Sequence, residues 1–139
     1  RVCEENRDYQ ECYYNLNLTK YDGNEIEYSF KLIDIANNTD ESRLTKIKVD
    51  TTSPKILKFA NWTSGRYAYF NMTINETNFD VVQYIDTSNP EAKWKTMCSS
   101  LKKDVCYKRI SFRAGQHNVL VRVLDKAGNS IEKEAKFMI

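Results

Sequence analysis

Apolar and polar residues alternate over short stretches of this chain. Residues 28–32, 68–74 and 119–123 each have an apolar side chain at every second position. A period of two is that of a strand with one buried face, whereas a helix repeats every 3.6 residues. The same pattern predicts further strands at 12–19, 44–49, 55–60, 79–86, 106–112 and 131–138. Many short strands without helical crossovers predict an antiparallel β-sandwich.

Two parts of the chain resemble each other. The spacing Cys-x₈-Cys-Tyr at residues 3–13 is similar to Cys-x₇-Cys-Tyr at residues 98–107. Farther along, both copies read Asp-x-Ala-x-Asn-Ser/Thr, beginning at Asp34 in the first and at Asp125 in the second. Alternating apolar residues precede this motif in each copy. A repeat of about 91 residues indicates tandem domains rather than the turns of a solenoid.

The repeat predicts how the chain is organised. Residues 1–50 correspond to the C-terminal half, about three strands, of a first module; residues 51–54 are a linker; residues 55–139 are a complete module of about seven strands. Half a sandwich leaves strand edges unpaired and exposes an apolar face, which is unfavourable in water. We expect this face to be an interface, and its residues are Tyr28, Phe30 and Leu32.

Several partners could cover that interface. A preceding segment of the same polypeptide, strands from a neighbouring subunit and the second module are the physical options. The alternative is that the chain has been cut. Because it begins with Arg and no signal-peptide pattern follows, we expect a mature chain or a fragment.

The linker Val-Asp-Thr-Thr-Ser-Pro at 49–54 and the closing hairpin Val-Leu-Asp-Lys-Ala-Gly-Asn at 123–129 carry a family resemblance. They resemble the tandem immunoglobulin-like repeats of bacterial and archaeal surface proteins, which typically begin with VDTTAP.I and end with V.A.D.AGN. The resemblance covers roughly residues 49–60 and 117–139, with the matching parts of the first copy. It implies an all-β fold, an antiparallel immunoglobulin-like β-sandwich in tandem, with one copy complete and one partial. It says little about function.

The four cysteines form two similarly spaced pairs. Three disulfide connectivities are possible, and the repeat favours Cys3 with Cys12 and Cys98 with Cys106. A metal site is disfavoured, because the chain has no Cys-x-x-Cys and a single histidine. Persistent disulfides imply an oxidising compartment, so we expect the protein to be secreted or on the cell surface.

Asn-x-Thr triplets are unusually frequent. With 13 asparagines and 10 threonines, a random order gives about one such triplet, and five occur. The alternative to N-glycosylation is that these threonines merely favour strands. We interpret the five asparagines as glycan attachment sites: Asn17, Asn37, Asn61, Asn71 and Asn75.

Charge and hydropathy exclude several partners. Twenty-one Lys and Arg against nineteen Asp and Glu leave a net charge of +2, and neither sign gathers into a long block. This gives no basis for nucleic-acid binding. No apolar run approaches the roughly 18 residues that a membrane-spanning helix needs, so direct membrane insertion is not expected.

The chain offers no recognisable catalytic motif. His117 lies in an expected turn before a strand, and no Gly-x-Ser-x-Gly elbow or phosphate-binding glycine loop is present. We therefore predict no enzyme activity and no catalytic residues. Calcium could bind at Asp22, Asp34 or Asp125, but we prefer the interpretation that these aspartates cap their own turns. N-linked glycans are the only attached group that we expect.

The sequence thus predicts a structural module of a glycosylated extracellular surface protein or filament. It would act by mechanical spacing and by strand-mediated assembly with other copies or with adjacent immunoglobulin-like modules. The alternatives are an adhesin or carbohydrate-binding module, and a non-catalytic spacer of a secreted enzyme. Of the two tryptophans, Trp94 is the better candidate for the core, because Trp62 lies within a glycosylation triplet.

Overall fold

The computed structural model describes residues 2–5 and 10–139, with side chains from residue 11 onward. The chain divides into two compact units, residues 1–51 (unit 1) and 52–139 (unit 2). Within the described ranges the fold is all-β, and the strands pair antiparallel. A single 3₁₀ turn, η1 (Thr19–Tyr21), is the exception among these residues. The division between the units falls in the segment that the sequence marks as a linker.

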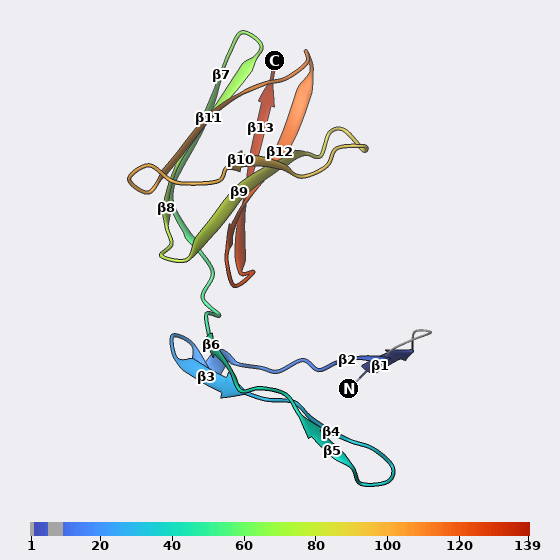
Figure 1. The fold of residues 1–139 in the computed structure, drawn as a ribbon. Helices are drawn as coiled ribbons and strands as arrows, with labels where there is room; N and C mark the ends of the chain where they lie inside the picture. Colours follow the sequence, from blue (N-terminus) through green and yellow to red (C-terminus); the bar gives the residue numbers. More distant parts are fainter. Residues whose placement is uncertain (1, 6–9) are drawn as a thin grey trace. The chain divides into compact units, whose positions relative to one another are not determined.

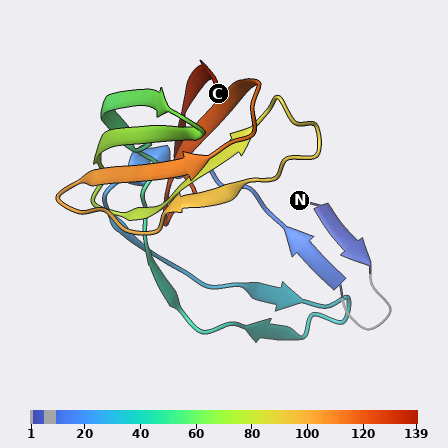
Figure 2. The same ribbon diagram turned by 90° about the horizontal axis from the view of Figure 1, so that it is seen from above.

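Unit 2 consists of two antiparallel sheets. One has the order β11-β8-β7 and the other the order β10-β9-β12-β13. Figures 1 and 2 show the two sheets as separate layers. The strands are β7 (Lys55–Ser64), β8 (Tyr67–Asn75), β9 (Phe79–Asp86), β10 (Lys95–Cys98), β11 (Val105–Ser111), β12 (Gln116–Asp125) and β13 (Ser130–Met138).

The core of unit 2 lies between these sheets. Alternate residues of β8 and β12 face it, as the period-two pattern predicts, because successive side chains of a strand point to opposite faces. Each fully buried Val, Ile, Phe or Met contributes about 1.5 to 3 kcal/mol relative to an exposed one. The buried cluster comprises Ala68, Phe70, Met72, Ile74, Val82, Met97, Cys106, Val119, Val121, Val123 and Ala135.

Unit 1 is built from short two-stranded ribbons. β3 pairs with β6, β4 pairs with β5, and β1 pairs with β2. Val49 is the one buried residue among its described side chains. The strands are β1 (Val2–Glu5), β2 (Gln10–Tyr13), β3 (Glu25–Tyr28), β4 (Lys31–Ile33), β5 (Thr39–Glu41) and β6 (Thr45–Lys48).

The strands of unit 1 differ from the sequence-based expectation of about three longer ones. The strand expected over 12–19 ends at Tyr13. Beyond it, the side chain of Asn17 accepts hydrogen bonds from the Thr19 backbone N–H, at 3.0 Å, and the Thr19 hydroxyl, at 2.6 Å. Such a local turn competes with sheet pairing, and it leads here into the 3₁₀ turn.

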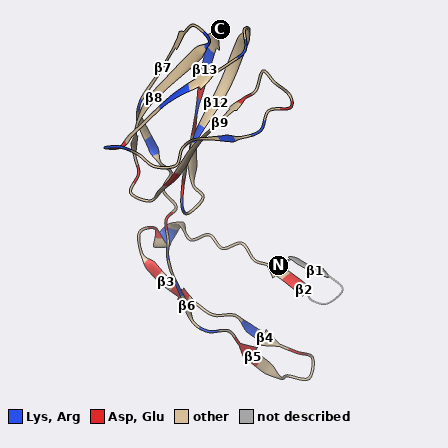
Figure 3. Ribbon diagram, turned by 45° about the horizontal axis from the view of Figure 1, so that its top comes forward, with Lys and Arg blue, Asp and Glu red and all other residues tan. Residues whose placement is uncertain are grey.

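Two further properties hold for the described residues. No helix among them is both long and apolar enough to span a bilayer. Lys and Arg occur beside Asp and Glu in both units, as Figure 3 shows, so neither sign of charge gathers on one unit.

Candidate assembly surface and glycosylation sites

The hairpin of β12 and β13 turns through a hydrogen-bonded loop at Asp125–Asn129. The N–H of Asp125 donates to the carbonyl of Asn129 at 3.0 Å. In return, Asp125 Oδ1 accepts the N–H groups of Ala127, at 2.9 Å, and Asn129, at 2.8 Å, and its Oδ2 accepts Asn129 Nδ2 at 2.8 Å. Gly128 supplies the positive φ of 89° that closes the turn. The buried carboxylate of Asp125 therefore organises the whole loop.

Unit 1 contains the same turn at Asp34–Asn38. Asp34 N–H donates to the Asn38 carbonyl at 3.0 Å, and Asp34 Oδ1 accepts the N–H groups of Ala36 and Asn38, each at 2.8 Å. Asn38 Nδ2 donates to Oδ2 at 2.7 Å, and Asn37 takes the left-handed position with a φ of 64°. The side-chain hydrogen bond from Asn38 is the largest cause that lowers the pKa of Asp34.

Strand pairing next to the two turns is also equivalent. Ile33 pairs with Thr39 in unit 1, and Leu124 pairs with Ser130 in unit 2. From these pairs the ladder of unit 2 continues in one register to Gln116 opposite Met138, whereas that of unit 1 shifts by one residue and ends with Glu25 opposite Lys48. One difference is an interruption in unit 1, where Phe30 and Ser42 bridge the gap between the β3–β6 and β4–β5 ribbons through hydrogen bonds of 2.8 Å.

The two hairpins differ sharply in burial. Val119, Val121 and Val123 are 0% exposed. At the matching positions of unit 1, Tyr28 is 39%, Phe30 70% and Leu32 69% exposed. Likewise Ala135 is buried, whereas Leu44, at the matching position, is exposed. We call Tyr28, Phe30 and Leu32 the open face; the rings of Tyr28 and Phe30 contact each other edge to face at 5.6 Å.

The hairpins differ in pairing as well. In unit 2, β12 lies between β13 and β9 and is paired along both edges. In the described part of unit 1, β3 and β4 pair along one edge only, with β6 and β5. An apolar face and a strand edge are thus accessible on the same segment, residues 25–33.

The expected glycosylation sites occupy different settings. Asn71 and Asn75 lie on β8 and are exposed, with Asn71 opposite Ala60 and Tyr107, and Asn75 opposite Lys55. Asn61 is half-buried and lies opposite Phe70, on the side of β7 that faces the core. Asn61 is therefore the least accessible of these three.

The two sites of unit 1 lie in turns. Asn17 is exposed and holds the Thr19 hydroxyl at 2.6 Å, so the first and third residues of that triplet are already in contact. Asn37 is exposed at the left-handed position of the Asp34 turn. Glycosylation at all five asparagines remains a prediction.

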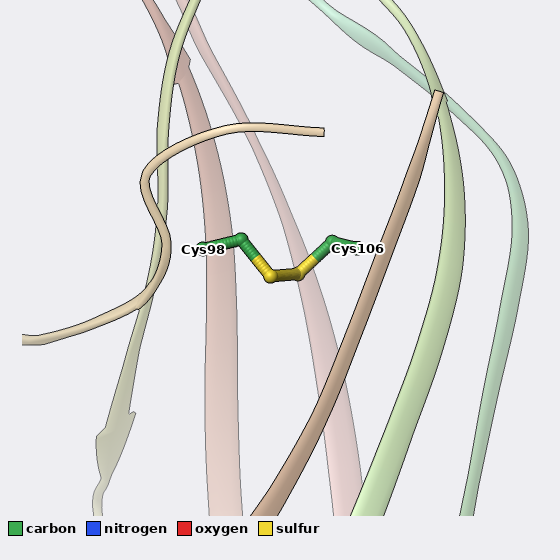
Figure 4. The surroundings of a disulfide bond; sticks show 2 residues. All are labelled: Cys98 and Cys106. Carbon is green, nitrogen blue, oxygen red and sulfur yellow. A yellow bond between two sulfur atoms is a disulfide. The ribbon is translucent and has the colours of Figure 1, made fainter. Parts of the chain in front are cut away.

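One disulfide joins Cys98 at the end of β10 to Cys106 on β11, and Figure 4 shows it. It links an edge strand of one sheet to an edge strand of the other. Cys12 is also disulfide-bonded, and Cys3 is its neighbour in the β1–β2 register. The Cys3 side chain lies outside the described residues.

His117 is held by two acceptors. Its Nδ1 lies 2.6 Å from Asp86 Oδ2, and its Nε2 lies 2.8 Å from the carbonyl oxygen of Arg113. Burial opposes the charged form, but the hydrogen bonds to the Arg113 carbonyl and to Asp86 outweigh it, so the pKa of His117 lies above its usual value. Because both ring nitrogens are engaged, His117 braces the start of β12 rather than offering a free base.

Asp86 has the complementary shift. Burial disfavours its ionised form, yet hydrogen bonds from His117 and Ser88 outweigh burial and lower its pKa. No sequence pattern predicted this pair, because Asp86 and His117 are 31 residues apart and meet through the β9–β12 pairing.

The aspartates considered for calcium accept hydrogen bonds from backbone N–H groups. The carboxylates of Asp34 and Asp125 accept N–H groups of their own loops, as described above. These contacts of Asp34 and Asp125 agree with the turn-capping interpretation. Asp22 differs, because its Oδ1 accepts the N–H of Thr51, 29 residues away, at 2.6 Å.

The two tryptophans lie in different surroundings. Trp94 lies outside the core cluster: it is half-buried, with the Arg122 guanidinium 3.9 Å from its ring centroid, and Arg122 is in turn held by Gln83 at 2.7 Å. Trp94 is nevertheless the more buried of the two tryptophans, because Trp62 is 45% exposed. Polar groups on the outer side of the β9–β12 pair provide a cation–π site for the indole instead.

No family model and no curated protein matches this sequence.

Proposed function

We propose that this chain is a structural segment of an extracellular surface protein or filament, and that strands from a neighbouring subunit complete unit 1. The observation that carries the proposal is the contrast between the two hairpins. They share a turn and its register, yet the positions buried in unit 2 are exposed in unit 1. The hairpin of unit 1 has the alternating apolar residues of a buried strand, yet these residues are exposed. A partner is therefore required to cover them.

The strand order of unit 2 supports an immunoglobulin-like interpretation. With β7, β8 and β11 as strands A, B and E, the sheets correspond to A-B-E and C′-C-F-G, with β12 as F and β13 as G. The hairpin of residues 25–48 then corresponds to F and G of a second copy. In the described part of unit 1 no strand pairs where β9 pairs in unit 2, antiparallel to β12 with Val82 opposite Val123.

The free edge of residues 25–33 explains how a partner would bind. A donated strand pairs through main-chain hydrogen bonds and places alternate apolar side chains against the open face, which is the mode called β-strand addition. A subunit that accepts a strand at one site and donates one from another makes a head-to-tail contact, which propagates instead of closing. Assembly of this kind forms a filament.

An extracellular location is part of the proposal. The Cys98–Cys106 disulfide supports it, because such bonds persist in oxidising surroundings. Exposed triplets at Asn17, Asn71 and Asn75 support it as well, since sugars on exposed faces and edges hinder unwanted sheet association.

The proposal is tested by Phe30→Asp, with Ile35→Asp as the matched control. Ile35 is an exposed apolar residue of the same hairpin, but its counterpart in unit 2 is the exposed Lys126 of the turn. Sedimentation velocity and negative-stain microscopy of the chain should show concentration-dependent polymers for the wild type and Ile35→Asp. Phe30→Asp should remain monomeric.

Two results would overturn this proposal. One is polymerisation of Phe30→Asp equal to that of the wild type. The other is a longer native polypeptide that stays monomeric while its preceding residues protect the amides of residues 25–33 from hydrogen exchange, because the partner is then within the same molecule.

A further inference from the structure

Unit 2 carries a cluster of aromatic side chains on the outer side of the β11-β8-β7 sheet. Trp62 on β7 stacks on Tyr69 of β8, with ring centroids 5.3 Å apart and an interplanar angle of 1°. Trp62 also approaches Tyr107 of β11 at 6.3 Å. Trp62 is 45% and Tyr107 55% exposed. We call these three residues the aromatic face; β7, β8 and β11 lie side by side in Figure 1.

Strand register places the Asn71 triplet on this face. Asn71 follows Tyr69 by two residues on β8, so both side chains point outward, opposite to the buried Phe70 and Met72. Across the strands, Asn71 lies directly between Ala60 and Tyr107. Thr73 completes the triplet on the same side. The small side chain of Ala60 leaves room beside the exposed Asn71.

We propose that the aromatic face binds the first sugar rings of a glycan attached to Asn71. A pyranose has a flat side of C–H groups that packs on aromatic rings, and its hydroxyls can bond the polar end of tyrosine or tryptophan. Trp62 and Tyr107 flank the attachment point and offer such surfaces. The inference rests on the proposed glycosylation of this chain and not on its assembly.

Attachment itself is ordinary N-glycosylation. A transferase joins Asn71 Nδ2 to C1 of the first sugar; the bond between C1 and the phosphate oxygen of a lipid-diphosphate-linked oligosaccharide breaks, and the amide nitrogen loses one proton. The lipid diphosphate leaves with the electron pair of that bond. The aromatic face takes no part in this exchange and acts on the product.

Tethering favours the attached glycan over a free one. Contacts between a sugar and two or three aromatic rings are weak, but a covalently linked sugar has an effective concentration in the millimolar range or above. A glycan on Asn71 would also obstruct the approach of other ligands to Trp62 and Tyr107. Asn75 provides a matched comparison, because it lies on the same strand and the same side but pairs with Lys55 rather than with an aromatic residue.

The test asks whether the effect of removing the Asn71 glycan on the thermal midpoint depends on the aromatic rings. The full chain, produced in a host that N-glycosylates, is compared with Asn71→Gln, Trp62→Ala and the double variant by calorimetry, with glycopeptide mass spectrometry of each site. Loss of the Asn71 glycan should lower the thermal midpoint by about 4 °C in the wild type. In the Trp62→Ala background the same loss should have little effect.

Controls make the result specific. Tyr69→Phe keeps the aromatic ring, so in that background the loss of the Asn71 glycan should lower the thermal midpoint as it does in the wild type. Asn75→Gln should change the thermal midpoint equally with and without Trp62→Ala. If Trp62→Ala fails to fold, Tyr107→Ala replaces it, since Tyr107 is more exposed. A glycan on Asn71 whose effect is independent of the rings overturns the inference, and so does an Asn71 that carries no sugar while Asn75 does.

Another outcome assigns the face differently. The Asn71→Gln chain could bind free oligosaccharides and lose that binding when Tyr107→Ala is added. The aromatic face would then be a receptor for external glycans, and the inference would be overturned. None of these outcomes bears on whether Phe30→Asp abolishes polymers, so failure of this inference and failure of the assembly proposal are distinguishable.

Discussion

Asn129 holds Asp125 from two directions: its backbone N–H donates to Oδ1 and its side-chain Nδ2 donates to Oδ2, each at 2.8 Å. The pair Asn38 and Asp34 repeats this contact in unit 1. One carboxylate thus replaces water for several N–H groups in each loop. The two copies differ in burial, since Asp125 is buried and Asp34 is exposed.

This difference predicts unequal effects of the same substitution. Asp125→Ala should lower the free energy of unfolding of unit 2 by about 2 to 3 kcal/mol, because it removes a buried carboxylate that accepts three N–H groups of the loop. Asp34→Ala should change stability much less, because water can replace the carboxylate there. Urea unfolding of the full chain measures both. Equal losses would mean that burial does not determine the strength of the turn.

The open face predicts a second contrast. Val121→Ala should destabilise unit 2 by about 1 to 3 kcal/mol through lost burial and a small cavity. Phe30→Ala should stay within about 0.5 kcal/mol in the unassembled chain, because Phe30 is already exposed. Hydrogen exchange should also be faster over residues 25–33 than over 116–124. Strong protection of residues 25–33 in a monomer would contradict the exposure of that face.

The Cys98–Cys106 disulfide should stabilise unit 2. Its cysteines are 8 residues apart, and a loop of that size contributes about 2 to 3 kcal/mol in the chain-entropy description. Replacing both cysteines by alanine should lower the urea midpoint of unit 2. The matched change at Cys3 and Cys12 should leave that midpoint unaltered, because those residues belong to unit 1.

The turn between Lys102 and Val105 offers a stabilising substitution. Lys103 and Asp104 both have positive φ, 50° and 63°, which costs most for Lys103, because glycine, asparagine and aspartate adopt such values more readily than other residues. Replacing them by Asn-Gly, the preferred pair for such a turn, should raise the free energy of unfolding by about 1 kcal/mol. Chemical denaturation checks this. Asn-Ala, which lacks the glycine, is the control and should give a smaller gain.

The pair His117 and Asp86 predicts a pH dependence. A histidine whose pKa is raised by folding contributes stability that is present below its unfolded pKa and lost as pH rises through its folded pKa. An aspartate whose pKa is lowered contributes stability that is present above its unfolded pKa and lost as pH falls through its folded pKa. Unit 2 should therefore be most stable between the unfolded pKa values of the two groups.

Urea unfolding at a series of pH values measures this profile, and NMR follows the single histidine directly. His117→Gln should remove the decline on the alkaline side and reduce that on the acidic side, where the hydrogen bonds from Ser88 still lower the pKa of Asp86. An imidazole that titrates at or below its usual pKa in the folded chain would contradict the double hydrogen bond.

Much of the architecture was predictable from local sequence patterns. The strict alternation at 68–74 and 119–123 marked the buried faces of β8 and β12, because a strand repeats every two residues. The motif Asp-x-Ala-x-Asn predicted both turns, since its carboxylate and amide bond their own backbone. Similar cysteine spacing indicated the Cys98–Cys106 bond.

Contacts between distant segments were not predictable in this way. The Asp86–His117 pair and the aromatic face both depend on which strands lie side by side. So does the contact of Trp94, just before β10, with Arg122 on β12, since β9 lies between those two strands. The break between β3 and β4 was not predictable either, because residues 28–32 alternate as the residues of β12 do. The hydrogen bonds between Phe30 and Ser42 separate the β3–β6 pairing from the β4–β5 pairing.

Local patterns of residues were enough to predict an all-β fold, the two Asp-x-Ala-x-Asn turns and which side chains of a strand share a face, because these follow from the geometry of neighbouring residues. Which of those faces is covered depends on contacts between distant segments. Val121 and Phe30 belong to the same alternating pattern, yet Val121 is buried and Phe30 is exposed. A second sheet packs against the strand of Val121, and burial depends on such a second layer.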